Sequence, residues 1–123
     1  MADRVADTSL LAALFFNEPR AAEAEAMISN ARLHEPTLLA SELASVCRKK
    51  ILHHRQLREP LLSSLEIGLS LDIKWVTVDQ VAIVELALET ELTTYDATFL
   101  WLSRALGVPL LTFDEQLLRF AET

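Results

Sequence analysis

The chain has 123 residues, which is the length of one ordinary domain. Its hydrophobic content is 51% and its mean hydropathy is +0.26, but the longest uninterrupted apolar run, Leu10 to Phe16, is far too short for a bilayer span of about 20 residues. The net charge of −7, taken alone, argues against a nucleic-acid ligand. We therefore expect a single domain over residues 1–123, cytoplasmic and without a membrane anchor, in which the lone Cys47 forms no disulfide.

The first half of the chain alternates short strands with helices. Proline at position 19 can occupy a first helical position, and the Ala- and Glu-rich residues after it favour a helix. The elements expected here are a weak strand at 2–6, a helix from Thr8 to about Phe16, a helix from Arg20 to Ala31, a minimal strand at 33–35, and a helix from Thr37 or Ser41 to about Ile51.

The second half continues the same alternation. Residues 73–78 are the most strand-like segment, with Ile, Trp, Thr and two Val. The elements expected here are a helix from Glu59 to about Leu69 that ends near Gly68, the strand at 73–78, helices at 79–92 and 95–106, a strand at 108–112, and a helix at 114–121. Strands separated by helices pair in parallel, which predicts an α/β sheet covered on both faces.

Four carboxylates fall where such a fold could bring them together. Asp7 ends the first strand and Asp114 follows the last one, and ligands of open α/β sheets bind beyond the carboxyl ends of the strands. Asp96 lies in the first turn of a helix with few polar positions. Glu42 lies at the margin of the apolar stripe of its helix, so its side chain is expected to face inward.

Two interpretations of these acids stay open. Asp7, Asp96 and Asp114 could be ordinary helix caps or partners of the helix dipole. Glu42 differs, because burial of a carboxylate without a partner costs several kcal/mol or forces protonation. Its partner could be a core Arg, a hydroxyl group or a cation. Several carboxylates held together repel one another unless a divalent ion compensates, and their hard oxygen atoms select Mg²⁺ or Mn²⁺ over zinc.

The charge distribution weakens the argument against RNA. The segment 48–58 carries five of the eleven Lys and Arg residues, namely Arg48, Lys49, Lys50, Arg55 and Arg58. Without the four candidate acids, the net charge would be −7 + 4 = −3. The adjacent His53 and His54 do not share a helix face, so we expect them on a solvated or RNA-facing surface rather than at a metal.

Four short motifs, in order, resemble one known family. They are Asp7-Thr8-Ser9 after the first strand, Ser41-Glu42-Leu43-Ala44-Ser45-Val46, Thr94-Tyr95-Asp96-Ala97 and Leu111-Thr112-Phe113-Asp114. This pattern resembles PIN-domain ribonucleases, specifically the VapC-like toxins of bacterial toxin–antitoxin pairs. The resemblance extends from Val5 to Ala121. Many relatives carry Asn where this chain has Ser45, and some continue into a further strand after the last helix.

The resemblance implies a PIN-like three-layer α/β/α domain with a short central parallel sheet of about four strands and about seven helices. It implies that Asp7, Glu42, Asp96 and Asp114 bind Mg²⁺ or Mn²⁺, with Thr8, Ser9 and Thr112 as polar neighbours. The implied activity is endoribonucleolytic cleavage of RNA by metal-activated water. A cognate antitoxin and a homodimer are also implied. The helices around Leu10–Phe16, with Met27 and Ile28 nearby, are of a kind more often found in a core than at an interface, and the resemblance suggests them as the antitoxin groove.

Two rival functions follow from the same residues. A catalytically silent binding module of the same fold would keep the four acids as caps or as an RNA or protein contact site. A phosphatase with an aspartyl nucleophile also places Asp after its first strand, but it needs a second Asp two residues later, where this chain has Ser9.

Overall fold

Four strands and seven α-helices make up residues 1–121, the part of the chain that the computed structural model describes. In chain order they are β1 (Ala2–Ala6), α1 (Thr8–Phe15), α2 (Ala21–Ile28), β2 (Ala31–Pro36), α3 (Leu38–His53), α4 (Arg58–Leu69), β3 (Lys74–Val76), α5 (Gln80–Thr90), α6 (Thr94–Leu106), β4 (Leu110–Leu111) and α7 (Glu115–Ala121), with one turn of 3₁₀ helix at Arg55–Leu57. None of these helices is long and apolar enough to cross a membrane.

The four strands form one parallel sheet in the order β3-β2-β1-β4. The chain moves outward from β1 through β2 to β3, and then returns to place β4 on the opposite side of β1. The order therefore reverses between β1 and β4, and the carboxyl ends of these two strands are where open parallel sheets bind ligands.

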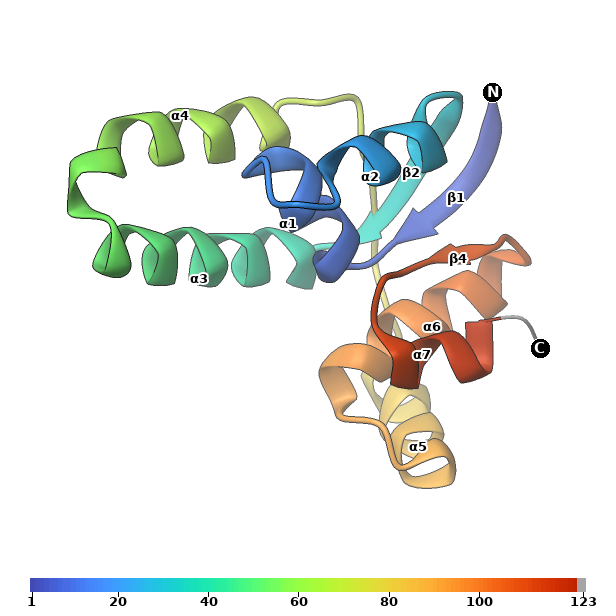
Figure 1. Cartoon of the computed structure of the whole chain (residues 1–123). Helices are drawn as coiled ribbons and strands as arrows, with labels where there is room; N and C mark the ends of the chain where they lie inside the picture. Colours follow the sequence, from blue (N-terminus) through green and yellow to red (C-terminus); the bar gives the residue numbers. More distant parts are fainter. Residues whose placement is uncertain (122–123) are drawn as a thin grey trace.

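Helices cover both faces of the sheet (Figure 1). On one face α6 packs against β1, β2 and β4, and α5 and α7 gather around it. On the other face α1 and α2 lie together, and α2 contacts β2. The α3–α4 hairpin projects from the body of the domain as an arm (Figure 1). This confirms the three-layer α/β/α fold, with four strands and seven helices within residues 1–121.

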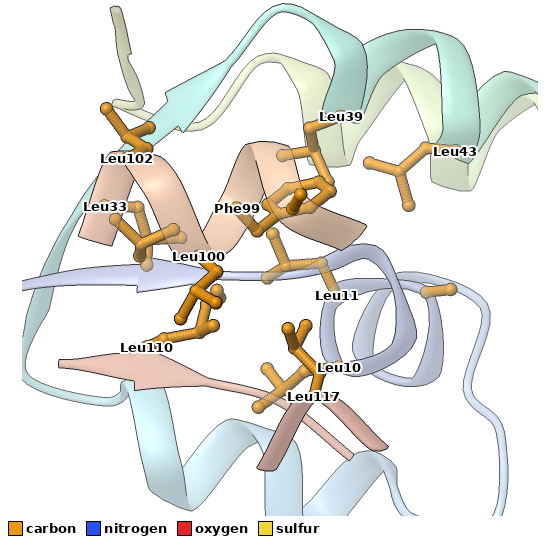
Figure 2. Close-up of a cluster of buried hydrophobic side chains, with 14 of the residues drawn as sticks. Leu10, Leu11, Leu33, Leu39, Leu43, Phe99, Leu100, Leu102, Leu110 and Leu117 are labelled. Atoms are coloured by element: carbon orange, nitrogen blue, oxygen red, sulfur yellow. The ribbon is translucent and has the colours of Figure 1, made fainter. Parts of the chain in front are cut away.

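Leucine side chains from α1, α3 and α6, together with Phe99, form the centre of the core (Figure 2). Each fully buried side chain of this kind stabilises the fold by about 1.5–3 kcal/mol. The members with almost no exposed surface are Leu10, Leu11, Leu39, Leu43, Phe99, Leu100 and Leu102. Because Leu10 and Leu11 are core residues, the expectation that this stretch of α1 lines an antitoxin groove is wrong for them.

The helix expected from Arg20 to Ala31 is shorter at both ends. Arg20 has a non-helical backbone (φ −97°, ψ 18°), and Ala31 pairs with Ala2 as the first residue of β2. The edge strands β3 and β4 are also shorter than expected, because each has only one neighbouring strand and pairs with it over three and two residues, respectively.

The helix α4 ends at Leu69, one residue after Gly68, as expected. A Cβ atom at Gly68 would lie 2.4 Å from a carbon of the Phe15 ring. The glycine therefore permits the close approach of α1 and α4. A second glycine has the role of a helix cap. The helix α6 ends at Leu106, and Gly107, with a positive φ of 66°, is its C-cap, as expected.

Candidate metal site at the ends of β1 and β4

Asp7 is the N-cap of α1 and is buried, with 4% of its surface exposed. Its Oδ1 accepts the Leu10 N–H at 3.2 Å and the Ser9 hydroxyl at 2.7 Å. Its Oδ2 accepts the Thr112 hydroxyl at 2.6 Å. A cap requires only the first of these bonds, so the two hydroxyl groups hold the carboxylate in one orientation beyond what capping needs.

The environment of Asp7 disfavours its ionised form. Burial raises the pKa of Asp7 from an ordinary 3.8 to about 6, and the charge of Asp96 adds to this increase. The hydrogen bonds from Thr112, Ser9 and the Leu10 amide act in the opposite direction but do not cancel the effect. Negative charge at this position is therefore incompletely compensated.

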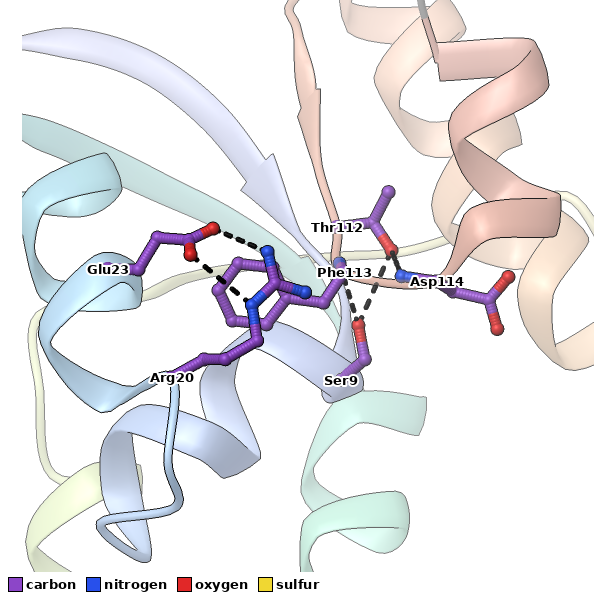
Figure 3. A network of polar contacts seen from close by, with 6 residues as sticks. All are labelled: Ser9, Arg20, Glu23, Thr112, Phe113 and Asp114. Atoms are coloured by element: carbon purple, nitrogen blue, oxygen red, sulfur yellow. Dashed lines mark hydrogen bonds and ion pairs between the residues drawn. The ribbon is translucent and has the colours of Figure 1, made fainter.

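The turn after β4 is tied to the turn after β1 (Figure 3). Thr112 Oγ1 accepts the Asp114 N–H at 2.9 Å while it donates to Asp7. Ser9 Oγ accepts the Phe113 N–H at 3.0 Å. Asp114 in turn caps α7, because its Oδ1 accepts the Leu117 N–H at 2.9 Å. The two hydroxyl groups thus fix Asp114 relative to Asp7.

Glu42 reaches the same region from α3. It is half-buried, and its Oε1 accepts the Thr8 hydroxyl at 2.5 Å. Burial raises the pKa of Glu42, the Thr8 bond opposes this, and the charge of Asp96 raises the pKa further. Of the partners left open by the sequence, the structure provides a hydroxyl group.

Asp96 links the other three acids electrostatically. It lies in the first turn of α6, but Thr93 is the cap, because Thr93 Oγ1 accepts the Asp96 N–H at 3.1 Å. Burial raises the pKa of Asp96, and the charge of Asp114 adds to this. Since Asp96 also raises the pKa of Asp7 and Glu42, the fold brings all four acids into one electrostatic cluster.

The chemistry of this cluster fits a hard divalent cation. Its donors are carboxylate oxygens only, and burial raises the pKa values of Asp7, Glu42 and Asp96, so a bound cation would stabilise their ionised forms. Within residues 1–121, no three His, Cys, Asp or Glu side chains form a ready cage. Mg²⁺ typically keeps several waters and uses one or two carboxylates plus substrate oxygens, so an open cluster suits it better than a closed one.

Glu35 is a buried acid that the sequence analysis did not single out. It is 0% exposed, its Oε2 accepts the Ala6 N–H at 2.9 Å, and its Oε1 has no partner within residues 1–121. Burial raises its pKa well above the usual range, against the effect of the Ala6 bond, and the charge of Asp7 raises it further. Strand alternation from the buried Leu33 would have placed Glu35 on an inward face.

Arg20 was also missed, and no local signal marks it. Its guanidinium lies over the Phe113 ring, 3.7 Å from the centroid, and two of its nitrogens pair with Glu23 (Figure 3). Arg20, Phe113 and Ser9 border a hollow of about 300 Å³. The positively charged guanidinium of Arg20 therefore lies beside Phe113, the residue between Thr112 and Asp114.

The basic segment 48–58 lies on the α3–α4 arm. The Lys50 Nζ forms an ion pair with Glu18 Oε2 at 2.8 Å. Arg48, Arg55 and Arg58 border a hollow of about 390 Å³ between α3 and α4, whose other walls are mainly apolar. His53 is the last residue of α3 and His54 its C-cap, and both are exposed. Cys47 is buried, as expected of a small hydrophobic side chain.

Comparison with known proteins assigns the family. The PIN domain model matches residues 4–123. The chain belongs to the PIN-domain family. This PIN domain is 37% identical over 121 residues to Ribonuclease VapC3 of Pyrobaculum aerophilum, an alignment that covers 92% of this chain and 90% of that protein.

Solved structures share the fold of this PIN domain at low sequence identity. PAE2754 from Pyrobaculum aerophilum has a TM-score of 0.79 and 22% identity, over 98% of this chain and 87% of that one. Mycobacterium tuberculosis VapC20, a sarcin-ricin loop cleaving toxin, has 0.70 and 20%, over 94% and 93%. VapBC2 from Rickettsia felis, bound to a promoter DNA fragment, has 0.69 and 16%, over 96% and 92%.

Proposed function

We propose that this PIN domain is a Mg²⁺- or Mn²⁺-dependent endoribonuclease, the toxin component of a type II toxin–antitoxin pair that acts in the cytoplasm. The observation that carries the proposal is the electrostatic cluster of Asp7, Glu42, Asp96 and Asp114 at the point where the strand order reverses. The relationship to a VapC ribonuclease supports the activity.

The four acids have distinct parts in this proposal. Asp7, whose carboxylate is held by the Thr112 hydroxyl, is the most firmly oriented of the four and anchors the site. The charge of Asp96 interacts with Asp7 and with Asp114. Glu42 and Asp114 complete the set of oxygen donors. When bound, a divalent ion would lower the pKa of a water molecule to generate the attacking hydroxide and would stabilise the departing 3′-oxygen. No side-chain nucleophile is needed.

Conservative substitutions test the site. Asp7→Asn and Asp96→Asn should each abolish Mg²⁺- or Mn²⁺-dependent cleavage of RNA while the circular dichroism spectrum stays unchanged. Asp79→Asn is the matched control, because Asp79 is an exposed N-cap of α5 that accepts the Ala82 N–H at 3.0 Å. Cleavage at the wild-type rate by either site variant would refute the assignment.

A second candidate function is a catalytically silent module of the same fold. It is favoured by the fact that the carboxyl groups of Asp7 and Asp114 both cap the helices that follow them, which is an ordinary structural role for aspartate. Calorimetric titration with Mn²⁺ separates the two functions. The nuclease should bind Mn²⁺ in a way that Asp7→Asn removes, whereas the silent module should show no such binding.

The RNA is proposed to approach across Arg20 and the basic arm. Arg20 keeps guanidinium donors beyond the two that Glu23 uses, and it lies beside the hollow at Phe113. Arg48, Arg55 and Arg58 extend the positive charge along the arm. Single-stranded or loop RNA fits such a site, because its bases can splay out and stack on Arg and aromatic side chains.

Exposed apolar surfaces support the proposal of protein partners. On α5 the side chains of Val81 and Leu88 are 72% and 77% exposed, and Val84 lies between them on the same stripe. On the other side of the domain, Phe15, Ile67 and Leu71 border a hollow of about 320 Å³ between α1 and α4. A homodimer contact and an antitoxin segment would cover surfaces of this kind.

Two measurements test the partners. Co-expression with a cognate antitoxin should suppress the toxicity of this protein, and loss of suppression with Ile67→Asp would place the antitoxin at the α1–α4 hollow. Sedimentation at micromolar concentration should give a dimer, and Leu88→Asp should give a monomer if α5 forms the contact. Toxicity that persists on co-expression, or a monomeric wild-type protein, would count against the respective partner.

A further inference from the structure

The central strand changes its hydrogen-bonding neighbour at the level of Glu35. The paired residues of β1 and β2 end at Arg4 and Leu33, and the last two residues of β1 pair with β4 instead. At the same level β2 pairs outward, with β3, through His34 to Pro36. Strands β1 and β2 therefore part just before the residues that lead into the candidate metal site.

The Glu35 carboxyl group bridges this parting. The Ala6 N–H donates to Glu35 Oε2 at 2.9 Å rather than to a backbone carbonyl of β2. One residue further on, the Asp7 N–H donates to the Leu111 carbonyl of β4 at 3.0 Å. The backbone that presents Asp7 is thus held from both sides, by a side chain of β2 and by the main chain of β4.

Burial of the Glu35 carboxyl group lowers the stability of the folded protein. Glu35 is fully buried, and its second oxygen has no partner within residues 1–121. An unpaired polar atom in the core costs free energy that an apolar side chain of similar size would avoid. Because Glu35 destabilises the core in this way, we look for a role of this residue other than packing.

We propose that Glu35 is a positioning residue of the metal site, which fixes Asp7 by holding the Ala6 N–H at the end of β1. This inference rests on the proposed metal-dependent function. The residue acts through the backbone and is not a metal ligand. What it must supply is a buried acceptor of the right length, and the carboxamide of glutamine offers one as well as a carboxyl group does.

Three variants separate this role from ordinary packing. Glu35→Gln keeps an acceptor for the Ala6 N–H, and Glu35→Leu removes it at similar volume. Leu33→Ala is the matched control, because Leu33 is buried on the same face of the same strand and is an apolar residue. The readouts are Mn²⁺ affinity by calorimetry, hydrogen exchange of the Ala6 amide by NMR, and thermal unfolding.

Glu35→Gln should keep the wild-type Mn²⁺ affinity and a protected Ala6 amide. Glu35→Leu should weaken Mn²⁺ binding by about 10- to 100-fold, the usual effect of losing a group that orients a metal ligand, and should speed exchange at Ala6. Leu33→Ala should lower the unfolding temperature without either effect. Wild-type affinity in Glu35→Leu, or equal losses in Glu35→Gln and Glu35→Leu, would overturn the proposal.

The Ala6 amide keeps the two proposals distinguishable. If the wild-type protein binds no Mn²⁺, the proposed function fails, and exchange at Ala6 still reports whether Glu35 holds the end of β1. If Glu35→Leu does not fold, the wild-type protein and Glu35→Gln decide the question, because an Ala6 amide that exchanges freely in both would refute the bridge.

Discussion

The ends of β3 and β4 carry the same local pattern and differ in what surrounds it. β3 runs into Thr77-Val78-Asp79 and β4 into Thr112-Phe113-Asp114. In both, the aspartate caps the next helix: Asp79 accepts the Ala82 N–H at 3.0 Å, and Asp114 accepts the Leu117 N–H at 2.9 Å. Judged by local structure alone, the two turns are equivalent.

Their neighbours in the sheet make them different. β4 lies beside β1, so Thr112 is buried with 3% exposure and donates to Asp7, whereas β3 lies beside β2 and Thr77 is exposed. A Thr-x-Asp turn becomes part of a candidate site only where the strand order reverses. The capping bonds of Asp7 and Asp114 are therefore compatible with the metal-binding role proposed for them.

The largest expected effect comes from exchanging the two aspartates for asparagine. Asn caps helices about as well as Asp, so Asp114→Asn and Asp79→Asn should both fold with similar unfolding temperatures. Asp114→Asn should lower the rate of Mn²⁺-dependent RNA cleavage by more than about 100-fold, because even groups that only orient a metal ligand are worth about 10- to 100-fold. Asp79→Asn should cleave normally. Equal rates for the two variants would remove the distinction between the turns.

The next effect is on stability and concerns the burial of Asp7 beside β4. With a pKa of about 6 when folded and an ordinary value of 3.8, Asp7 binds its proton more tightly in the native state than in the unfolded chain. Its contribution to stability is therefore complete below about pH 4 and is lost as the pH rises through about 6, a loss of about 3 kcal/mol by pH 7.

Urea unfolding in EDTA between pH 4 and pH 7 measures this loss. Asp7→Asn should gain stability relative to the wild-type protein by the same amount as the pH rises, because asparagine does not titrate. Added Mn²⁺ should restore wild-type stability at pH 7 and leave Asp7→Asn unchanged. If the stability difference between the wild-type protein and Asp7→Asn does not vary with pH, the pKa of the buried Asp7 carboxyl group is not raised.

A smaller effect is expected at the two threonines. Thr112→Val removes the hydroxyl that donates to Asp7 and accepts the Asp114 N–H, so Mn²⁺ affinity should fall by about 10- to 100-fold. Thr77→Val is its counterpart at the end of β3 and should bind Mn²⁺ as the wild-type protein does. Calorimetry on both variants is the measurement, and an unchanged affinity in Thr112→Val would show that Ser9 alone suffices to orient Asp7.

Sequence patterns predicted the helices, the parallel sheet and the four acids, because these depend on periodicity, on caps and on where strands end. Asp7, Glu42, Asp96 and Asp114 could be named because each sits at a recognisable position of its own element. Thr8, Ser9 and Thr112 were expected beside the acids only through the family resemblance, and their hydrogen bonds to Glu42 and Asp7 confirm it. Periodicity and caps alone could not show these hydrogen bonds between elements. That Thr112 rather than Thr77 meets Asp7 depends on which strand lies beside β1, and that order is set by tertiary packing.

Glu35 and Arg20 show two different limits of sequence interpretation. Alternation from Leu33 carried the signal that Glu35 faces inward, but a single acid in a minimal strand suggests no purpose without the partner N–H of Ala6. Arg20 carried no signal, since it was expected within a helix and instead precedes one. Its position over Phe113 results from a contact between residues that lie 93 positions apart in the chain (113 − 20 = 93).

The smallest effect expected is at Arg20, whose guanidinium lies over Phe113 in the turn after β4. Arg20→Ala should raise the KM for a single-stranded RNA by about fivefold, equivalent to about 1 kcal/mol for an exposed cation. The kcat and the Mn²⁺ affinity should stay unchanged, because Arg20 contacts none of the four acids in residues 1–121.

Salt dependence shows whether that loss is a phosphate contact. Removing one phosphate contact should reduce the slope of log affinity against log salt by about 0.7 for a single strand. Arg32→Ala is the control, because Arg32 is likewise exposed and ion-paired, with Asp3, but at the opposite end of the strands. If both variants lose affinity equally, the positive charge acts at long range over the whole surface; if only Arg20→Ala loses it, the RNA strand passes the β4 turn.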